Sequence, residues 1–242
     1  MLTEPTPTGH RPEDAAFWRA LADFEPTRLE PLQRQRVGKL WAQRAQMEHG
    51  SIASFSKFSL QLLGVGAPPQ LIEASHRAAI DEVHHARISF ALASKFLQAT
   101  LGPAGIPLAG DLLGDGSLAT AALETVRDGC VGESLAAAEA EAAAREAEDE
   151  ILRAAMTSIA RDEGQHAELA WRFVAWAIAV GGAPLRIEVT TAFESAIARS
   201  LAAESAHDDV PAGYGHLSPA RARQVREIAV REAIVPAIRA LG

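Results

Sequence analysis

Hydrophobic residues recur every three or four positions along most of the chain, which is the spacing of helices that bury one face. No stretch shows the alternating hydrophobic and polar positions of a half-buried strand. Clusters of Gly and Pro divide the pattern into segments, because these residues end helices or begin new ones. We therefore expect an all-α protein with helices over residues 12–24, 31–63, 70–100, 118–145, 150–180, 184–203 and 219–240.

The connection between the third and fourth of these helices, residues 101–117, contains seven Gly or Pro residues. It is unusually long for a helix bundle. Helix 70–100 continues for ~24 Å beyond its middle, so a return to the starting end of the bundle requires ~48 Å. About 16 extended residues supply at most about 53 Å. Helices 70–100 and 118–145 can therefore run parallel, joined by a crossover along the bundle.

The sequence Asp-Glu-x-x-His-Ala occurs twice, at residues 81–86 and 162–167. Glu-x-x-His alone occurs four times, whereas 21 Glu and 8 His would give roughly 0.7 matches by chance. The four matches are Glu73 with His76, Glu82 with His85, Glu163 with His166, and Glu204 with His207. Only the second and third follow an Asp, and this requirement lowers the chance expectation to roughly 0.03. We keep these two pairs as candidates.

Both candidate pairs lie in the middle of a hydrophobic helical stripe. The first stripe consists of Leu71, Ser75, Ala78, Glu82, His85, Ser89, Leu92 and Phe96. The second consists of Leu152, Met156, Ile159, Glu163, His166, Ala170 and Phe173. Glu73 and His76 lie on the opposite side of the first helix, since nine residues at about 100° each make half a rotation. We expect that opposite side to be solvated.

Two carboxylates drawn into hydrophobic faces need buried partners, because an unpaired buried charge is strongly destabilising. Metal ions are the simplest common partner. The other two long helices each place one acid in the middle of their hydrophobic face, Glu48 in helix 31–63 and Glu133 in helix 118–145. All four positions lie at similar distances from the turns between helices, so they can meet at one height in the bundle.

With these residues the chain resembles the ferritin-like di-iron carboxylate superfamily over about residues 35–180. That superfamily takes one Glu from each of two helices and Glu-x-x-His from each of the other two. The resemblance implies a four-helix bundle with a long crossover between its second and third helices. The metal ligands that it implies are Glu48, Glu82, His85, Glu133, Glu163 and His166.

The resemblance also implies a role for each member of the doubled motif. Glu82 and Glu163 would bridge two metal ions. Asp81 and Asp162 would each hold the ligand His of the opposite helix and fix its orientation. Four carboxylates and two imidazoles suit two iron ions, and manganese or a mixed iron–manganese pair fits the same ligands.

The resemblance suggests three regions in the chain. They are an N-terminal arm with a short helix (1–30), the di-metal bundle (31–182) and a C-terminal helical extension packed on it (183–242). The net charge of −8 and only three Lys argue against a nucleic-acid surface. No apolar stretch is long enough for a membrane span, and one Cys excludes an intrachain disulfide. We expect a soluble, cytoplasmic protein, and a homodimer is compatible with the sequence.

The leading functional hypothesis is a non-haem di-iron oxygenase or oxidase that uses dioxygen and an external electron donor to oxidise a small organic substrate. Gly129, Cys130 and Gly132 leave little bulk around Glu133 and can open a cavity at the metals, although close helix packing explains them equally well. The only tyrosine, Tyr214, is far from the ligands in sequence, which disfavours a tyrosyl radical. A ferroxidase or iron-storage protein is the alternative. A tRNA-modifying di-iron hydroxylase is less favoured because the chain is acidic.

Overall fold

A computed structural model shows that the protein is all-α, as expected from the sequence, with no strand in the described part of the chain. The structure describes residues 12–26, 28–107, 115–203 and 211–241. Residues 1–11 of the expected N-terminal arm lie outside these ranges. The helices are α1 (Pro12–Asp23), α2 (Pro31–Gly64), α3 (Pro69–Leu97), α4 (Leu118–Thr125), the π-helix η1 (Val126–Glu133), α5 (Ser134–Glu146), α6 (Glu150–Ala202), α7 (Pro219–Ala229), the π-helix η2 (Val230–Ile234) and α8 (Val235–Ala240).

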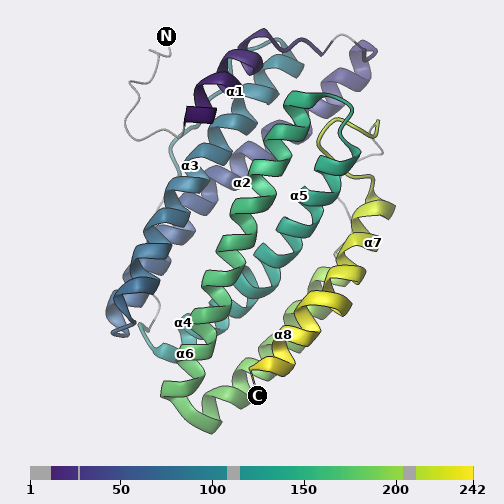
Figure 1. Cartoon of the computed structure of the whole chain (residues 1–242). Coiled ribbons are helices and arrows are strands. Elements are labelled where there is room, and N and C mark those ends of the chain that lie inside the picture. Colours follow the sequence, from purple (N-terminus) through teal and green to yellow (C-terminus); the bar gives the residue numbers. More distant parts are fainter. Residues whose placement is uncertain (1–11, 27, 108–114, 204–210, 242) are drawn as a thin grey trace.

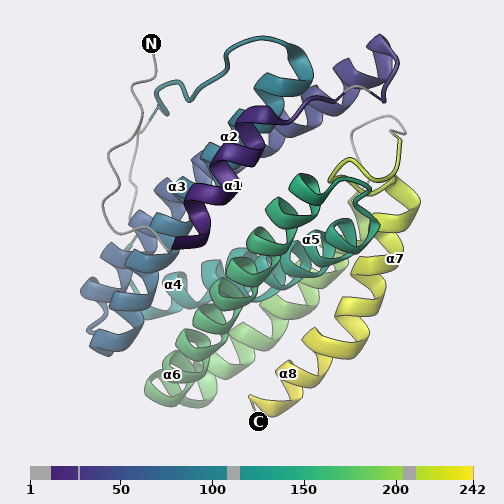
Figure 2. The same ribbon diagram turned by 45° about the horizontal axis from the view of Figure 1, so that its top comes forward.

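The long helices pack as two antiparallel pairs (Figure 1). α2 and α3 form one pair, and the continuous run α4–η1–α5 forms the other with the first half of α6. α3 and α4–α5 point in the same direction, as the length of the connection between them predicted. Figure 2 shows the start of this connection leaving the end of α3. It then passes the middle of α2, where His49 Nε2 lies 3.2 Å from the carbonyl oxygen of Ala104.

Side-chain caps fix the starts of three helices. Ser117 Oγ accepts a hydrogen bond from the Thr120 amide at the start of α4 (3.0 Å). At the start of α6, Asp149 Oδ1 accepts one from the Ile151 amide at 2.8 Å. Ser218 caps α7, with Pro219 as its first residue. Such caps satisfy amide groups that have no partner inside the helix.

α6 contains a sharp bend at Gly182, whose backbone has φ 69° and ψ −158°. This left-handed φ is accessible to glycine at little cost. The break expected between helices 150–180 and 184–203 is therefore present as a bend, after which Pro184 suits the start of the second half. The second half runs back along the molecule (Figure 1).

Three predicted helices differ from the structure. The helix expected over 118–145 is not α-helical throughout, because the eight residues of η1 are π-helical. The C-terminal helix is interrupted in the same way by η2. The helix expected over 70–100 ends at Leu97, because Gln98 takes a left-handed conformation with φ 53°. Periodicity alone did not predict these details, since a π-helical turn holds only about one residue more than an α-helical turn.

The hydrophobic core consists of two clusters, one toward each end of the long helices. One cluster contains Phe55, Leu71 and Phe173, and the other contains Trp41, Leu92 and Met156. Each long helix contributes to both clusters, and the buried acidic and histidine side chains lie at the level between them. Hydrophobic packing above and below thus holds a polar layer in place.

The C-terminal segments pack on the two helix pairs. Trp171 in the first half of α6 stacks on Phe193 in the second half, with ring centroids 5.0 Å apart. α7 is attached to α5 by two ion pairs, Arg221 with Glu146 at 2.7 Å and Arg226 with Glu139. α7 therefore covers the side of α5 that carries these two acids.

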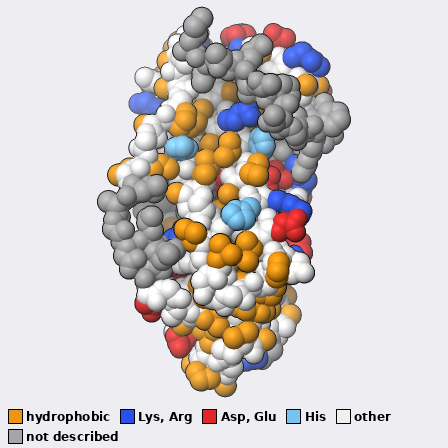
Figure 3. Space-filling view, turned by 90° about the vertical axis from the view of Figure 1, so that its left-hand side faces the viewer, with side chains coloured by type: hydrophobic (Ala, Val, Ile, Leu, Met, Phe, Trp, Pro, Cys, Tyr) orange, Lys and Arg blue, Asp and Glu red, His pale blue; other side chains and the backbone are white. Residues whose placement is uncertain are grey.

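α6 is the one described helix that is long and apolar enough to cross a membrane by length and composition. The core helix of a soluble protein passes the same test, and α6 has buried residues along its whole length and bends at Gly182. The structure is therefore compatible with the expected soluble protein. Figure 3 shows the side on which α3 lies, with hydrophobic and histidine side chains scattered among polar ones. Met47, Ile80 and Val83 are among the exposed hydrophobic residues of α2 and α3.

Candidate metal centre

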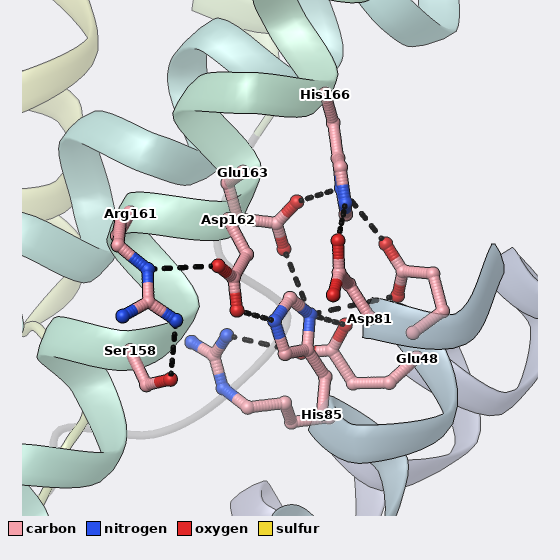
Figure 4. Close-up of polar contacts among 10 residues, drawn as sticks. Glu48, Asp81, His85, Ser158, Arg161, Asp162, Glu163 and His166 are labelled. Atoms are coloured by element: carbon pink, nitrogen blue, oxygen red, sulfur yellow. Dashed lines mark hydrogen bonds and ion pairs between the residues drawn. The ribbon is translucent and has the colours of Figure 1, made fainter. Parts of the chain in front are cut away.

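The six predicted ligand residues come together between the two helix pairs. Figure 4 shows four of them, Glu48, His85, Glu163 and His166. One ligand atom from each of Glu48, Glu82, His85 and Glu163 forms a group in which all atoms lie within 4.8 Å of one another. Glu82, Glu133, Glu163 and His166 form a second group within the same limit. Glu82 and Glu163 belong to both groups. The arrangement therefore offers two adjacent positions for a cation that share two carboxylates.

Four helical segments position these side chains. Glu82 and His85 lie one turn apart on α3, and Glu163 and His166 lie one turn apart on α6. Glu48 comes from the middle of α2, and Glu133 is the last residue of η1. All except Glu133 are buried, and Glu133 is half-buried.

Both imidazoles turn the same nitrogen toward the acids. His166 Nδ1 lies 3.2 Å from Glu82 Oε1 and 3.1 Å from Glu163 Oε2. His85 Nδ1 lies 3.8 Å from both Glu82 Oε2 and Glu163 Oε1. Each Nδ1 can thus face a cation held by the two shared carboxylates.

The outer nitrogen of each imidazole faces an aspartate of the opposite helix. His85 Nε2 lies 3.3 Å from Asp162 Oδ2, and His166 Nε2 lies 3.5 Å from Asp81 Oδ2. A carboxylate in this place holds the proton on Nε2 and leaves the lone pair of Nδ1 for a metal ion. The structure therefore places both members of the doubled motif where each can support the ligand of the other.

The cluster contains polar atoms that the protein itself does not satisfy. Glu82 Oε2 and His85 Nδ1 are buried and have no hydrogen-bond partner among the described residues. Atoms of this kind are rare in folded proteins, because burying them without a partner is destabilising. A divalent cation between the shared carboxylates would contact both. The donor set of carboxylate oxygens and imidazole nitrogens suits such an ion.

Without a cation, protons compensate part of the negative charge. Burial lowers the pKa of His85, but the hydrogen bond with Asp162 and the nearby negative carboxylates of Glu82, Glu163 and Glu48 outweigh it and raise the pKa to about 10. Burial raises the pKa of Glu48 to about 7, against the opposing effect of Arg44. Burial would also raise the pKa of Glu163, yet its hydrogen bonds to His166 and Glu133 hold it at about 2. The metal-free cluster is thus a network of shared protons.

Two arginines that the sequence analysis did not consider contact one side of the cluster. Arg44 Nη1 lies 3.4 Å from Glu48 Oε1. Arg161 Nε donates a hydrogen bond to Asp162 Oδ1 at 2.9 Å, beside the contact of Asp162 with His85 (Figure 4). The spacing of Arg44 and Glu48, four residues apart on one helix, was a signal that the sequence analysis missed. Both arginines balance acids on the His85 side.

A cavity of about 360 Å³ reaches the other side of the cluster, at Glu133 and His166. Its walls come from α2, α4, η1 and α6. Gly132 lines the cavity, and a Cβ atom there would meet only the Arg127 carbonyl oxygen, at 3.4 Å. Gly129 also lines it, but a Cβ there would lie 2.5 Å from Ala170 Cβ. Both explanations of the small residues thus hold, an open cavity at Gly132 and close packing at Gly129.

The residues that we set aside lie outside the cluster. Glu73 and His76 are exposed on the outer face of α3, as expected, and Glu73 pairs with Arg77. Glu204 and His207 lie outside the described residues. Cys130 is buried, and burial raises the pKa of its thiol far above the usual range. It packs in the core and does not line the cavity.

Comparisons with known proteins leave the metal centre to be interpreted from its own geometry. No protein-family model, no curated protein and no solved structure matches this chain.

Proposed function

We propose that the protein is a ferritin-like di-iron oxidoreductase that uses dioxygen to oxidise a small organic substrate. The observation that supports this most is the sharing of Glu82 and Glu163 by two ligand groups, one of which opens onto a cavity. Two carboxylates that belong to both groups can each contact two metal ions a short distance apart. The cavity supplies a place for a substrate beside one of them.

The six ligand side chains would hold two iron ions, and manganese fits the same donors. Ferrous ions bound here would supply electrons to dioxygen, and an external donor would restore them. The side chains of the protein would bind the ions and orient the ligand groups around them. Asp81 and Asp162 keep the imidazole nitrogens Nδ1 directed inward, and Arg44 holds Glu48.

The surroundings of the two imidazoles favour reaction on the His166 side. Phe55 packs against His166 with ring centroids 4.8 Å apart and lines the cavity. Phe58 and Leu169 add further apolar wall. Apolar walls exclude water and accommodate organic groups, which favours oxidation of an organic substrate over handling of iron alone. The two exposed charges beside the opening, Arg127 and Asp128, have opposite signs, so no basic surface for tRNA is formed there.

Metal content and dioxygen reactivity test the proposal. Protein purified from iron-rich medium should contain two iron ions per chain by elemental analysis. The reduced protein should then be mixed with dioxygen in a stopped-flow spectrometer, with and without candidate organic substrates. Oxidation of the metal centre that accelerates with a substrate, together with an oxidised product, supports an oxygenase or oxidase.

Other outcomes point to other functions. Mineralisation of added iron by a hollow multimeric assembly, with indifference to every organic addition, would indicate a ferroxidase or storage protein. Protein with no bound metal after growth in iron or manganese would refute the metal centre itself. The electron donor, a homodimeric assembly and a cytoplasmic location stay predictions.

A further inference from the structure

The cavity beside His166 has an apolar interior and a charged opening. Phe55, Leu169 and Ala170 line it and are buried. Arg127 and Asp128 line it and are exposed. A molecule that enters therefore passes polar groups first and reaches apolar walls next to the metal ligands Glu133 and His166. Its volume of about 360 Å³ is near the lower end of the range of about 300–1,000 Å³ that ligand pockets occupy.

The charges of this opening are already neutralised in pairs. Lys57 Nζ lies 2.7 Å from Glu124 Oε2, and the two side chains are only 31% and 30% exposed. Gln61 Nε2 donates a second hydrogen bond to Glu124, at 2.8 Å. Arg127 forms a two-pronged pair with Asp128, at 2.7 and 2.6 Å. An ionic ligand would lose its hydrating water on entering, and no unpaired opposite charge at the opening would compensate this loss.

Uncharged hydrogen-bonding groups are available at the same opening. Ser51 and Ser54 of α2 line the cavity, and no hydrogen bond joins either hydroxyl to another described residue. A hydroxyl or amide of a ligand can bond to them without separating the ion pair of Lys57 and Glu124.

We propose that this cavity selects small uncharged molecules, about the size of one substituted aromatic ring, with an apolar body and a hydroxyl or amide end. The apolar body lies against Phe55 and Leu169, and the polar end meets Ser51 and Ser54. The ion pair of Lys57 and Glu124 determines specificity by keeping the opening neutral. This inference rests on the proposed function, because such a molecule is the substrate class of the metal centre.

Three probes with one aromatic ring each and different charges test the selection. They are benzyl alcohol, benzylammonium and benzenesulfonate, titrated into the protein as purified and followed by ligand-observed NMR. Benzyl alcohol should bind at least about tenfold more tightly than either ion. Equal binding of all three probes, or no binding of benzyl alcohol, would overturn the proposal.

Two substitutions at the ion pair should change the preference in opposite directions. Glu124→Gln removes the negative charge and leaves Lys57 unpaired, so benzenesulfonate should gain about tenfold in affinity. Lys57→Met leaves Glu124 unpaired, so benzylammonium should gain by a similar factor. An order of affinities that stays unchanged in both folded variants would show that the pair does not set specificity.

Gly132 provides a steric test of where the probe binds. Gly132→Leu should fill the cavity and weaken benzyl alcohol by about tenfold or more, since the methylene groups occupy its volume. Gly50→Leu is the matched control, because Gly50 also lies in a helix near the ligands but does not line the cavity. Thermal unfolding curves of both variants would establish that each one folds. Equal loss of binding in both variants would place the probe elsewhere.

Failure of this inference is separable from failure of the metal centre. Metal content and oxidation by dioxygen are measured without any probe, whereas probe binding needs no turnover. If the protein contains two irons but does not prefer benzyl alcohol, the proposed selection of uncharged ligands is refuted, whereas the proposed metal centre stands. If the protein binds no metal but shows the predicted order of probe affinities, the ligand selectivity of the cavity is supported, whereas the di-iron function is refuted.

Discussion

The two halves of the candidate metal centre have the same ligand motif in different surroundings. The His85 half, with Glu48, is buried and lies beside Arg44 and Arg161. The His166 half contains the half-buried Glu133 and borders the cavity. A repeated motif thus gives two similar binding positions, while the neighbouring residues make one enclosed and the other accessible. Under the proposed function, the enclosed half would hold its metal ion more stably and the accessible half would meet the substrate.

The largest expected effect comes from removing a carboxylate that both halves share. Glu163→Gln should weaken metal binding at both positions by more than about 100-fold, because it removes a charged ligand from each group. Elemental analysis and calorimetric titration of the metal-free variant measure this loss. Glu73→Gln is the matched control, because this exposed Glu also stands three residues before a His. Equal metal loss in both variants would mean that the assignment of helix faces is wrong.

Substitution of the two unshared glutamates should separate the halves. Glu133→Gln and Glu48→Gln each remove a ligand found in only one group, so each variant should keep one metal ion. The ion that Glu48→Gln keeps is the one beside the cavity. A paramagnetic ion there should broaden the NMR signals of benzyl alcohol more strongly than the ion kept by Glu133→Gln. Equal broadening in the two variants would contradict the difference between the halves.

The faces of the helices could be predicted from sequence because burial follows helical periodicity closely here. Every residue of the stripes through Glu82 and Glu163, from Leu71 to Phe96 and from Leu152 to Phe173, is buried, whereas Glu73 is exposed. The search for one further acid on each remaining helix found Glu48 and Glu133, which the structure brings to the same cluster. Positions on one face of a regular helix are fixed by spacing alone.

Features that depend on contacts between helices could not be predicted in this way. The π-helical turns of η1 hold about one residue more per turn than an α-helix, and this changes the spacing of hydrophobic residues too little to predict a π-helix. Gly129 and Gly132 were the one local feature of the sequence that set this segment apart. The ion pairs of α7 with Glu139 and Glu146 depend on how the C-terminal segment folds back. The neutral pair of Lys57 and Glu124 joins residues 67 positions apart. Periodicity contains no information on such partners.

A smaller difference should appear when the aspartates behind the two imidazoles are replaced. Asp162 is 8% exposed and is also held by Arg161, whereas Asp81 is 25% exposed. Loss of a group that orients a ligand His typically reduces metal affinity by about 10–100-fold. Asp162→Asn should lie toward the upper end of this range and Asp81→Asn toward the lower end, in titrations against a competing chelator. A larger loss for Asp81→Asn would reverse the assignment of the enclosed half.

The smallest expected effect is a pH dependence of the metal-free protein. The pKa of His85 is raised from 6.5, its usual value, to about 10. Protonated His85 therefore stabilises the folded state most below about pH 6.5, and this stabilisation is lost as the pH rises through 10. Burial raises the pKa of Glu48 from 4.5, its usual value, to about 7. Stability therefore also falls as the pH rises from 4.5 through 7, because the folded state holds this proton more tightly than the unfolded state. Both shifts have the same sign, so metal-free protein should become less stable between pH 5 and pH 9.

Bound metal should oppose this loss of stability, because a cation replaces the protons on the imidazoles and therefore binds more tightly as the pH rises. Thermal unfolding followed by circular dichroism at pH 5, 7 and 9 measures the effect, and each kcal/mol lost lowers Tm by about 2–4 °C in a chain of this length. Calorimetry in buffers of different ionisation enthalpy should show proton release on metal binding at pH 7, since His85 and His166 have pKa values raised to about 10 and about 12 and must lose their protons to bind. Metal uptake without proton release would mean that the imidazoles are not the ligands, and the comparison of the two halves would then rest on their carboxylates alone.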